Sequence, residues 1–121
     1  MTQILSKIER PSYKIVKQTA DDYQIDRAAV RHILGISEST QFRYEKKNPI
    51  LKPNLADRWA RFEDILKLAN ELFDSKAKIQ RWLSTPKTAL ENKTPLELLA
   101  TNAGSRQVEQ MLNRAKYGIF S

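Results

Sequence analysis

Apolar residues recur at intervals of three and four along most of the chain, which is the period of an amphipathic helix. The longest such segment runs from Pro53, a residue typical of a first helical turn, to about Phe73. One row of its apolar stripe comprises Leu55, Trp59, Phe62, Leu66, Ala69 and Phe73, and a second row comprises Ile65, Leu68 and Leu72. So wide a stripe predicts burial against more than one neighbour. We expect this helix to be the spine that joins two halves of the chain, with a dimer contact as a further role.

Capping residues divide the segment before this spine into three shorter helices. The first begins at Pro11-Ser12 and carries an apolar face that ends near Tyr23. Asp26 is a typical N-cap for the second helix, which Gly35 ends, and Ser37 is a typical N-cap for the third, over about 38–46. The sequence therefore predicts a helical bundle before the spine.

The segment after the spine shows the same kind of pattern. Ser75 predicts the start of a short helix, and Thr94-Pro95-Leu96-Glu97 matches a capping box that begins another. Asn102-Ala103-Gly104 is expected to stop that helix, Ser105 to cap the last one, and Gly118 to end it. Strand signals are nearly absent, so the predicted fold class is all-α, divided into residues 1–74 and 75–121.

Charge is distributed unevenly between these two parts. The 121 residues carry a net charge of +7. Residues 1–74 hold 13 basic and 11 acidic side chains, whereas residues 75–121 hold 8 basic and 3 acidic ones. A basic balance of this kind favours nucleic acid or an acidic protein as a partner.

The segment from Asp26 to Lys46 has the form of a helix-turn-helix, with Gly35 in the turn. In that motif the second helix enters the major groove of DNA and presents its N-terminal side chains to base edges. The side chains expected to read bases or phosphates from that helix are Glu38, Ser39, Thr40, Gln41 and Arg43. Arg43 suits guanine and Gln41 suits adenine. Those better placed for phosphates are Lys46, Lys47 and Lys52.

Two residues depart from the usual helix-turn-helix pattern. Arg31 occupies a position that is often small, and Gln41 lies where an apolar core residue is often found. We expect Phe42 or Tyr44 to supply the missing packing, with a slight rotation of the helix. The alternative is a helical hairpin with a solvated outer face and no role in DNA binding.

The sequence offers little enzyme chemistry. It contains no cysteine and a single histidine, His32, which lies beside apolar helix positions and suits a packing or boundary role. The carboxylates are dispersed, and no Gly-rich phosphate loop is present. Trp59, Phe62, Phe73 and Trp82 fall at core spacing. We therefore expect no enzyme activity, no metal and no cofactor, and the absence of an apolar leader favours a location inside the cell.

Residues 25–121 resemble antitoxins of the Xre/MbcA/ParS type, which belong to bacterial type II toxin–antitoxin operons. The most specific stretch is WLSTPKTALENKTPLELLATNAG, over residues 82–104. Further matching positions are Leu51, Pro53, Asp57-Arg58, Ala69, Phe73, Val108, Leu112 and Tyr117-Gly118. Residues 1–24 add nothing to the resemblance.

The resemblance implies a division of labour between the two parts in the bacterial cytoplasm. Residues 1–74 would form a dimeric helix-turn-helix domain that binds operator DNA and represses its own operon. Residues 75–121 would bind and neutralise a toxin, most often a RES-domain protein that consumes NAD, by covering its active site. The residues expected to face the toxin come from the last helix and the tail: Arg106, Asn113, Arg114, Lys116, Tyr117, Gly118, Ile119 and Phe120. Ile119 and Phe120 suit insertion as an anchor or packing against the last helix.

Two other functions remain open from the sequence. One is a stand-alone helix-turn-helix regulator whose C-terminal part dimerises or senses a ligand. The other is an antitoxin whose helix-turn-helix no longer binds DNA, because of Arg31 and Gln41.

Overall fold

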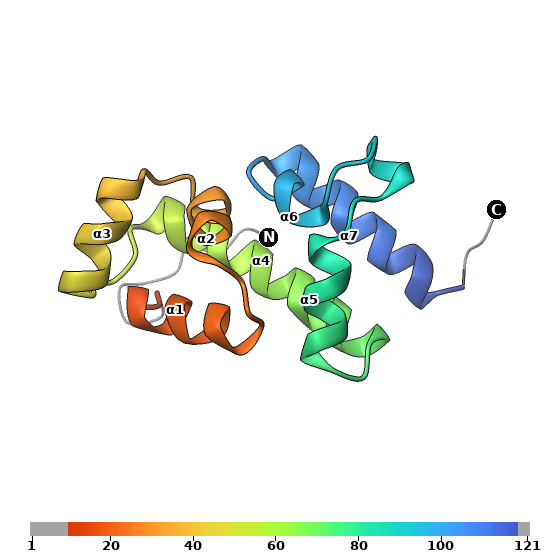
Figure 1. Cartoon of the computed structure of the whole chain (residues 1–121), viewed down its shortest axis with the longest axis horizontal. Helices are drawn as coiled ribbons and strands as arrows, with labels where there is room; N and C mark the ends of the chain where they lie inside the picture. The colour runs from red at the N-terminus through yellow and green to blue at the C-terminus, as the bar shows by residue number, and fades with distance from the viewer. Residues whose placement is uncertain (1–9, 119–121) are drawn as a thin grey trace.

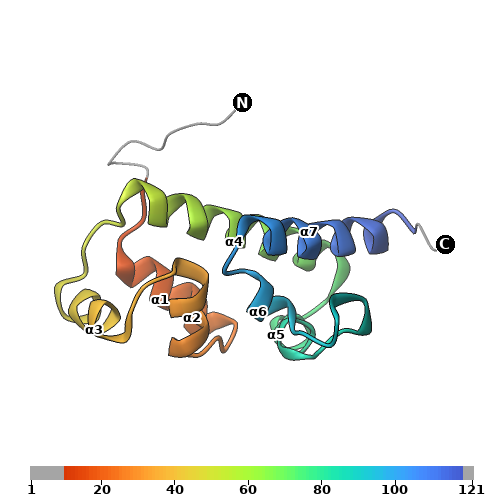
Figure 2. The same cartoon turned by 90° about the horizontal axis from the view of Figure 1, so that it is seen from above.

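The computed structural model describes residues 10–118, which form seven α-helices and one 3₁₀ helix with no strand. The all-α prediction is confirmed. The helices are α1 (Tyr13–Asp22), α2 (Arg27–Leu34), α3 (Glu38–Lys47), α4 (Pro53–Leu72), α5 (Lys76–Ser84), η1 (Thr88–Leu90), α6 (Pro95–Leu98) and α7 (Asn102–Lys116). Figure 1 shows α1, α2 and α3 grouped at one end, α5, α6 and α7 at the other, and α4 running between them. Seen from above, α4 and α7 lie along one side, with the remaining helices on the other (Figure 2).

Most helix starts form where the capping residues predict them. The side chain of Asp26 accepts a hydrogen bond from the backbone N–H of Ala29 at 2.8 Å. Ser37, Ser75 and Thr94 accept equivalent bonds at the starts of α3, α5 and α6. Each bond satisfies one of the backbone donors that a helix start leaves free.

The start of α7 differs from the prediction. The helix begins at Asn102 rather than after Ser105, because the hydroxyl of Thr101 accepts a hydrogen bond from the backbone N–H of Gly104 at 2.9 Å. Gly104 therefore lies inside the first turn of α7 and does not stop α6. A Cβ at Gly104 would collide with the carbonyl group of Leu98, coming within 2.8 Å of its carbon. This glycine thus permits the close approach of α6 and α7.

One hydrophobic core runs through both ends of the molecule, and α4 supplies its centre. Trp59 and Phe62 of α4 are almost completely buried, as their spacing predicted. They belong to the same cluster as Val16 of α1, Ile79 of α5 and Val108 of α7. The predicted boundary between residues 74 and 75 follows the end of α4, and residues on both sides of it contribute to this core.

Polar contacts also join the two groups of helices. The Nε2 atom of His32, on α2, lies 2.7 Å from the backbone oxygen of Glu97, on α6. The guanidinium group of Arg58, on α4, donates to the backbone oxygen of Ala100, which follows α6. His32 is thus a boundary residue between the two groups, in agreement with its sequence context.

Candidate functional site

The two helices of the helix-turn-helix, α2 and α3, are connected by a tight turn and by a side-chain pair. Gly35 adopts φ 70°, and its N–H donates to the carbonyl of Arg31 at 2.7 Å, which ends α2 in a left-handed conformation. The guanidinium group of Arg27, at the start of α2, makes two hydrogen bonds of 2.8 and 2.9 Å to the carboxylate of Glu45, near the end of α3. This bond from Arg27 lowers the pKa of Glu45. The pair links the start of α2 to the last turn of α3.

Gln41 does not face the groove as predicted, because its side chain is completely buried. Its Oε1 accepts a hydrogen bond from the guanidinium group of Arg31 at 2.7 Å. Its Nε2 donates to the hydroxyl of Tyr13 and to the backbone oxygen of Arg27, both at 3.0 Å. Both N–H groups of the amide are engaged and the side chain has no exposed surface, so it cannot read adenine and the prediction for Gln41 is wrong.

The two departures from the helix-turn-helix pattern therefore compensate each other. Arg31 reaches into the position that a small residue would leave open, and Gln41 receives its hydrogen bond where an apolar residue would pack. Tyr13 completes the arrangement. Burial raises the pKa of Tyr13, although the hydrogen bond from Gln41 acts in the opposite direction. The unusual residues thus join α2 and α3 through hydrogen bonds in place of apolar packing at these two positions.

The outer face of α3 is polar and mainly basic. Six of the predicted residues have exposed side chains. Lys52 immediately precedes α4, and the other five lie on α3: Glu38, Ser39, Arg43, Lys46 and Lys47. Thr40 is half-buried, and its hydroxyl accepts a hydrogen bond from the hydroxyl of Ser37 at 3.0 Å. Within residues 10–118, none of the four basic side chains in this set forms an ion pair. They remain available to phosphate groups.

The two aromatic residues of α3 lie on different faces. Tyr44 is buried, and its ring centroid lies 5.8 Å from that of Tyr13 in an edge-to-face contact. Phe42 is 55% exposed, and the ammonium group of Lys46 lies 4.6 Å from the centre of its ring. Tyr44 therefore supplies the packing expected of one of these residues. Phe42 stays on the outer face of α3, and sequence reasoning did not assign it a role there.

The predicted toxin-facing residues divide among three positions around α7. Arg106, Asn113 and Tyr117 are spaced by seven and four residues, so they follow one stripe of the helix, which we call its outer stripe. Arg106 is exposed and Asn113 is half-buried. Tyr117 is 67% exposed. Lys116 lies to one side, where its ammonium group is 2.9 Å from the carboxylate of Glu71 on α4. The hydrogen bond to Glu71 raises the pKa of Lys116.

Arg114 lies on the opposite side of α7 from Lys116. There it borders a hollow of about 390 Å³ whose other lining residues are Ala89, Leu90, Gln107, Gln110 and Met111. Gly118 follows the helix with φ 65°. Ile119 and Phe120 lie outside the described residues.

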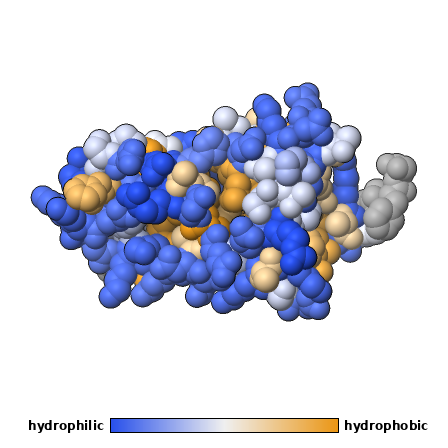
Figure 3. Space-filling model, in the orientation of Figure 1, coloured by the Kyte–Doolittle hydropathy of each residue, from blue (hydrophilic) through white to orange (hydrophobic). Residues whose placement is uncertain are grey.

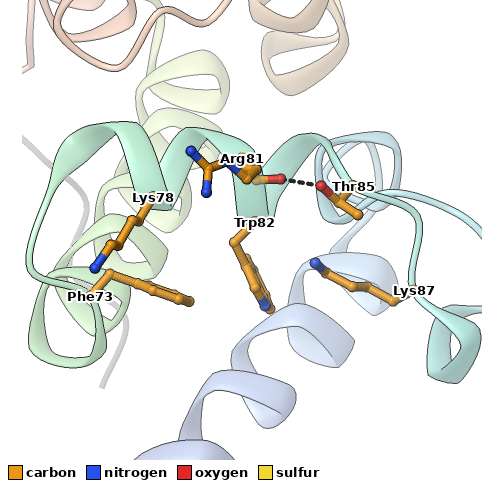
Figure 4. A pocket seen from close by; sticks show the side chains of 6 residues that line it. All are labelled: Phe73, Lys78, Arg81, Trp82, Thr85 and Lys87. Atoms are coloured by element: carbon orange, nitrogen blue, oxygen red, sulfur yellow. Dashed lines mark hydrogen bonds between the residues drawn. The ribbon is translucent and has the colours of Figure 1, made fainter.

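A basic and aromatic hollow beside α5 is a further feature that the sequence did not reveal (Figure 4). It measures about 320 Å³ and is lined by Phe73, Lys78, Arg81, Trp82, Thr85 and Lys87. Trp82 packs against the edge of the core with only part of its surface buried, so its predicted core role is only partly correct. The ammonium group of Lys87 lies 4.9 Å from the centre of the Trp82 ring. Burial at this place lowers the pKa of Lys87. We refer to these six residues as the Trp82 hollow.

Residues 10–118 contain neither a membrane-spanning helix nor a cluster of metal-binding side chains. No helix there has the length and apolar character needed to cross a membrane. The same residues contain no group of three or more histidine, cysteine or acidic side chains that could hold a metal ion.

Comparisons with known proteins show which family the chain is similar to. Residues 68–118 match a family described as the antitoxin Xre/MbcA/ParS C-terminal toxin-binding domain. An antitoxin Xre of Yersinia enterocolitica is 31% identical over 98 residues, which cover 80% of this chain and 66% of the relative. The chain belongs to the Xre antitoxin family. An antitoxin Xre of Pseudomonas putida is 39% identical over 70 residues, 58% of this chain and 43% of the relative. The matched regions thus span between two fifths and two thirds of these relatives.

The Xre family segment contains the C-terminal surfaces described above. Residues 68–118 run from the last turn of α4 to the end of α7, and they include the Trp82 hollow and the outer stripe of α7. The alignment with the Yersinia antitoxin is longer than this segment, so the similarity extends into the helices that precede it.

Proposed function

We propose that this chain is an antitoxin that neutralises a RES-domain, NAD-consuming toxin and also binds operator DNA to repress its own operon. The observation that carries the proposal is the position of the family's toxin-binding segment. That segment carries exposed aromatic and basic side chains, among them Tyr117 and Arg106. Its helices α5, α6 and α7 lie at the end of the molecule opposite to the helix-turn-helix (Figure 1).

The toxin contact is assigned to two features of the C-terminal part. The outer stripe of α7 offers Arg106 and Asn113 together with the exposed ring of Tyr117. The Trp82 hollow adds Arg81 and further basic groups. Arginine and large aromatic side chains are enriched among the residues that contribute most to protein interfaces. An acidic rim around the active site of the toxin would complement these charges.

The operator contact is assigned to the outer face of α3. Arg43 lies in the second turn, where a guanidinium group suits the O6 and N7 atoms of guanine. The exposed Lys46, Lys47 and Lys52 suit phosphate oxygens. We assign DNA binding to a homodimer, because two copies of such a motif match the two half-sites of a symmetric operator.

The test uses the full chain and the RES-domain protein encoded in the same operon. The two proteins should form a stable complex, and mixing them should abolish NAD consumption by the toxin. Arg43→Ala should weaken operator binding by about 1–3 kcal/mol while leaving neutralisation intact. Tyr117→Ala should weaken toxin binding while leaving operator binding intact.

The outcomes separate the candidate functions. Operator binding without any complex or loss of NAD consumption would favour a stand-alone regulator. Neutralisation without operator binding would favour an antitoxin that controls only the toxin. If both variants impaired both activities equally, the assignment of separate surfaces would be wrong.

A further inference from the structure

Phe42 is an exposed aromatic residue in the middle of the face that α3 would present to DNA. It lies four residues after Glu38 and four before Lys46, so these three residues follow one stripe of the helix. Its 55% exposure contrasts with the burial of Tyr44, two residues later. Among residues 10–118, Phe42 belongs neither to the hydrophobic core nor to the partly buried side chains that pack against it.

The exposure of Phe42 is imposed by the buried residue beside it. Gln41 is held in the interior by hydrogen bonds to Arg31 and Tyr13, and successive residues of a helix point about 100° apart. At the far end of α3, the pair between Arg27 and Glu45 restrains the same rotation. The ring therefore cannot turn inward without breaking this network.

The ring borders an open hollow whose other walls are polar. Arg27, Glu38, Ser39 and Phe42 line this hollow, which measures about 570 Å³. The ammonium group of Lys46 lies 4.6 Å from the ring centroid and covers one side of the ring. A ligand that fits this arrangement carries hydrogen-bonding edges, a negatively charged backbone and one small apolar group.

The major groove of DNA provides this combination at thymine, because the C5-methyl group of thymine is the apolar group that base pairs display there. We propose that Phe42 contacts a thymine methyl group in the operator and thereby sets part of its sequence specificity. The inference rests on the proposed operator binding by α3. Phe42 thus takes the base-reading role that the sequence predicted for Gln41, the residue before it in α3.

The charged surroundings of Phe42 favour DNA over a protein surface. Lysine is depleted from the centres of protein interfaces, whereas Lys46 and Lys47 lie within five residues of this ring. These cations would also attract the phosphate backbone on either side of the base.

The experiment compares operators that differ by single methyl groups. Footprinting of the DNA upstream of the gene first defines the operator, and each thymine in the footprint is then replaced by deoxyuridine, one at a time. This replacement removes the methyl group and keeps the hydrogen-bonding edge of the base. Fluorescence anisotropy at fixed salt measures the affinity of the full chain for each DNA.

We expect one thymine position per half-site at which deoxyuridine weakens binding of the unmodified chain about fourfold, the value for burial of one methyl-sized group. Phe42→Ala should bind the thymine and deoxyuridine operators equally at that position. Phe42→Leu should retain a preference for thymine, because its side chain remains apolar. Lys47→Ala is the matched control, and it should weaken binding to both DNAs while leaving their ratio unchanged.

The results distinguish failure of this inference from failure of operator binding. A chain that binds DNA with no thymine preference at any position overturns the role of Phe42 alone, and so does a preference that persists in Phe42→Ala. A chain that binds no upstream DNA overturns the proposed repressor function as well. Circular dichroism of each variant verifies that the helical fold is retained.

Discussion

The hydrogen bond between Arg31 and Gln41 provides a direct test of how this helix-turn-helix is stabilised. Gln41 is completely buried and Arg31 is half-buried, and their side chains meet at 2.7 Å. Replacing either residue by alanine leaves a polar group of the other without its partner. Replacing both residues removes the two groups together. The double variant should therefore lose less free energy of unfolding than the sum of the losses in the two single variants.

The expected magnitudes follow from the environment of the two groups. A buried polar group that loses its partner costs about 1–3 kcal/mol, so Arg31→Ala should lower the free energy of unfolding by about 2 kcal/mol. Gln41→Ala should cost slightly more, because it also removes the donor to the Tyr13 hydroxyl and leaves a cavity. The loss in the double variant should be smaller than the sum of the two single losses by about 1.5–3 kcal/mol, the value of a hydrogen bond to a charged group.

Equilibrium unfolding in urea, followed by circular dichroism, gives the free energies of the four proteins. The exposed pair Lys17–Asp21, at 3.3 Å, is a control whose coupling should stay below about 0.5 kcal/mol. If the losses at Arg31 and Gln41 add to within about 0.5 kcal/mol, the two residues do not stabilise each other. The account of their mutual compensation would then be refuted.

Three further changes test other parts of the structure. Gly104→Ala should lower the free energy of unfolding by about 1–3 kcal/mol, because the clash with the Leu98 carbonyl outweighs the better helix propensity of alanine. Glu45→Gln should cost at most about 1 kcal/mol at pH 7. Because Arg27 lowers the pKa of Glu45, this stabilisation is present above the ordinary carboxyl pKa, and unfolding curves should show it lost as the pH falls through the lowered pKa. Arg81→Glu should weaken toxin binding by about tenfold in a titration while leaving operator affinity unchanged.

Each of these changes has a matched control in the same region of the chain. Ala103→Gly measures how much alanine stabilises the helix relative to glycine at the exposed neighbouring position. If Gly104→Ala raised the free energy of unfolding by this same amount, the clash with Leu98 would be excluded. Glu109→Gln changes an exposed carboxylate on α7, so a pH dependence equal to that of Glu45→Gln would exclude the role of Arg27. Lys93→Glu reverses a charge outside the Trp82 hollow. An equal loss of toxin binding in this variant would indicate a general charge effect.

The features that the sequence predicted well depend on residues within four positions of each other. The N-cap bonds of Asp26 and Ser37 close over three residues, and the left-handed Gly35 is bonded four residues back. The buried face of α4 follows from its helical period alone. Such local signals define where helices begin and end, and which side of each is buried.

The features that were missed depend on contacts between distant segments. The burial of Gln41 requires Tyr13, which is 28 residues away. Gly104 matches the pattern of a helix stop, and only the closeness of the Leu98 carbonyl shows its different role. Trp82 has the spacing of a core residue, but α5 lies at the edge of the core, which leaves the ring partly open. Sequence spacing identifies the buried side of a helix and not the distance from that side to its neighbours.

The separation of the two proposed surfaces follows from the length of α4. Its 20 residues span about 30 Å at 1.5 Å per residue, and α3 and the end of α7 lie at opposite ends of the molecule (Figure 1). The face in Figure 3 is largely hydrophilic between these ends, with apolar areas near its middle. A toxin that covers the outer stripe of α7 would therefore leave α3 open to DNA. The contact of His32 with Glu97, on the other hand, joins the two groups directly, so coupling between the surfaces would have a route through the packing of α2 against α6 as well as through the core around α4.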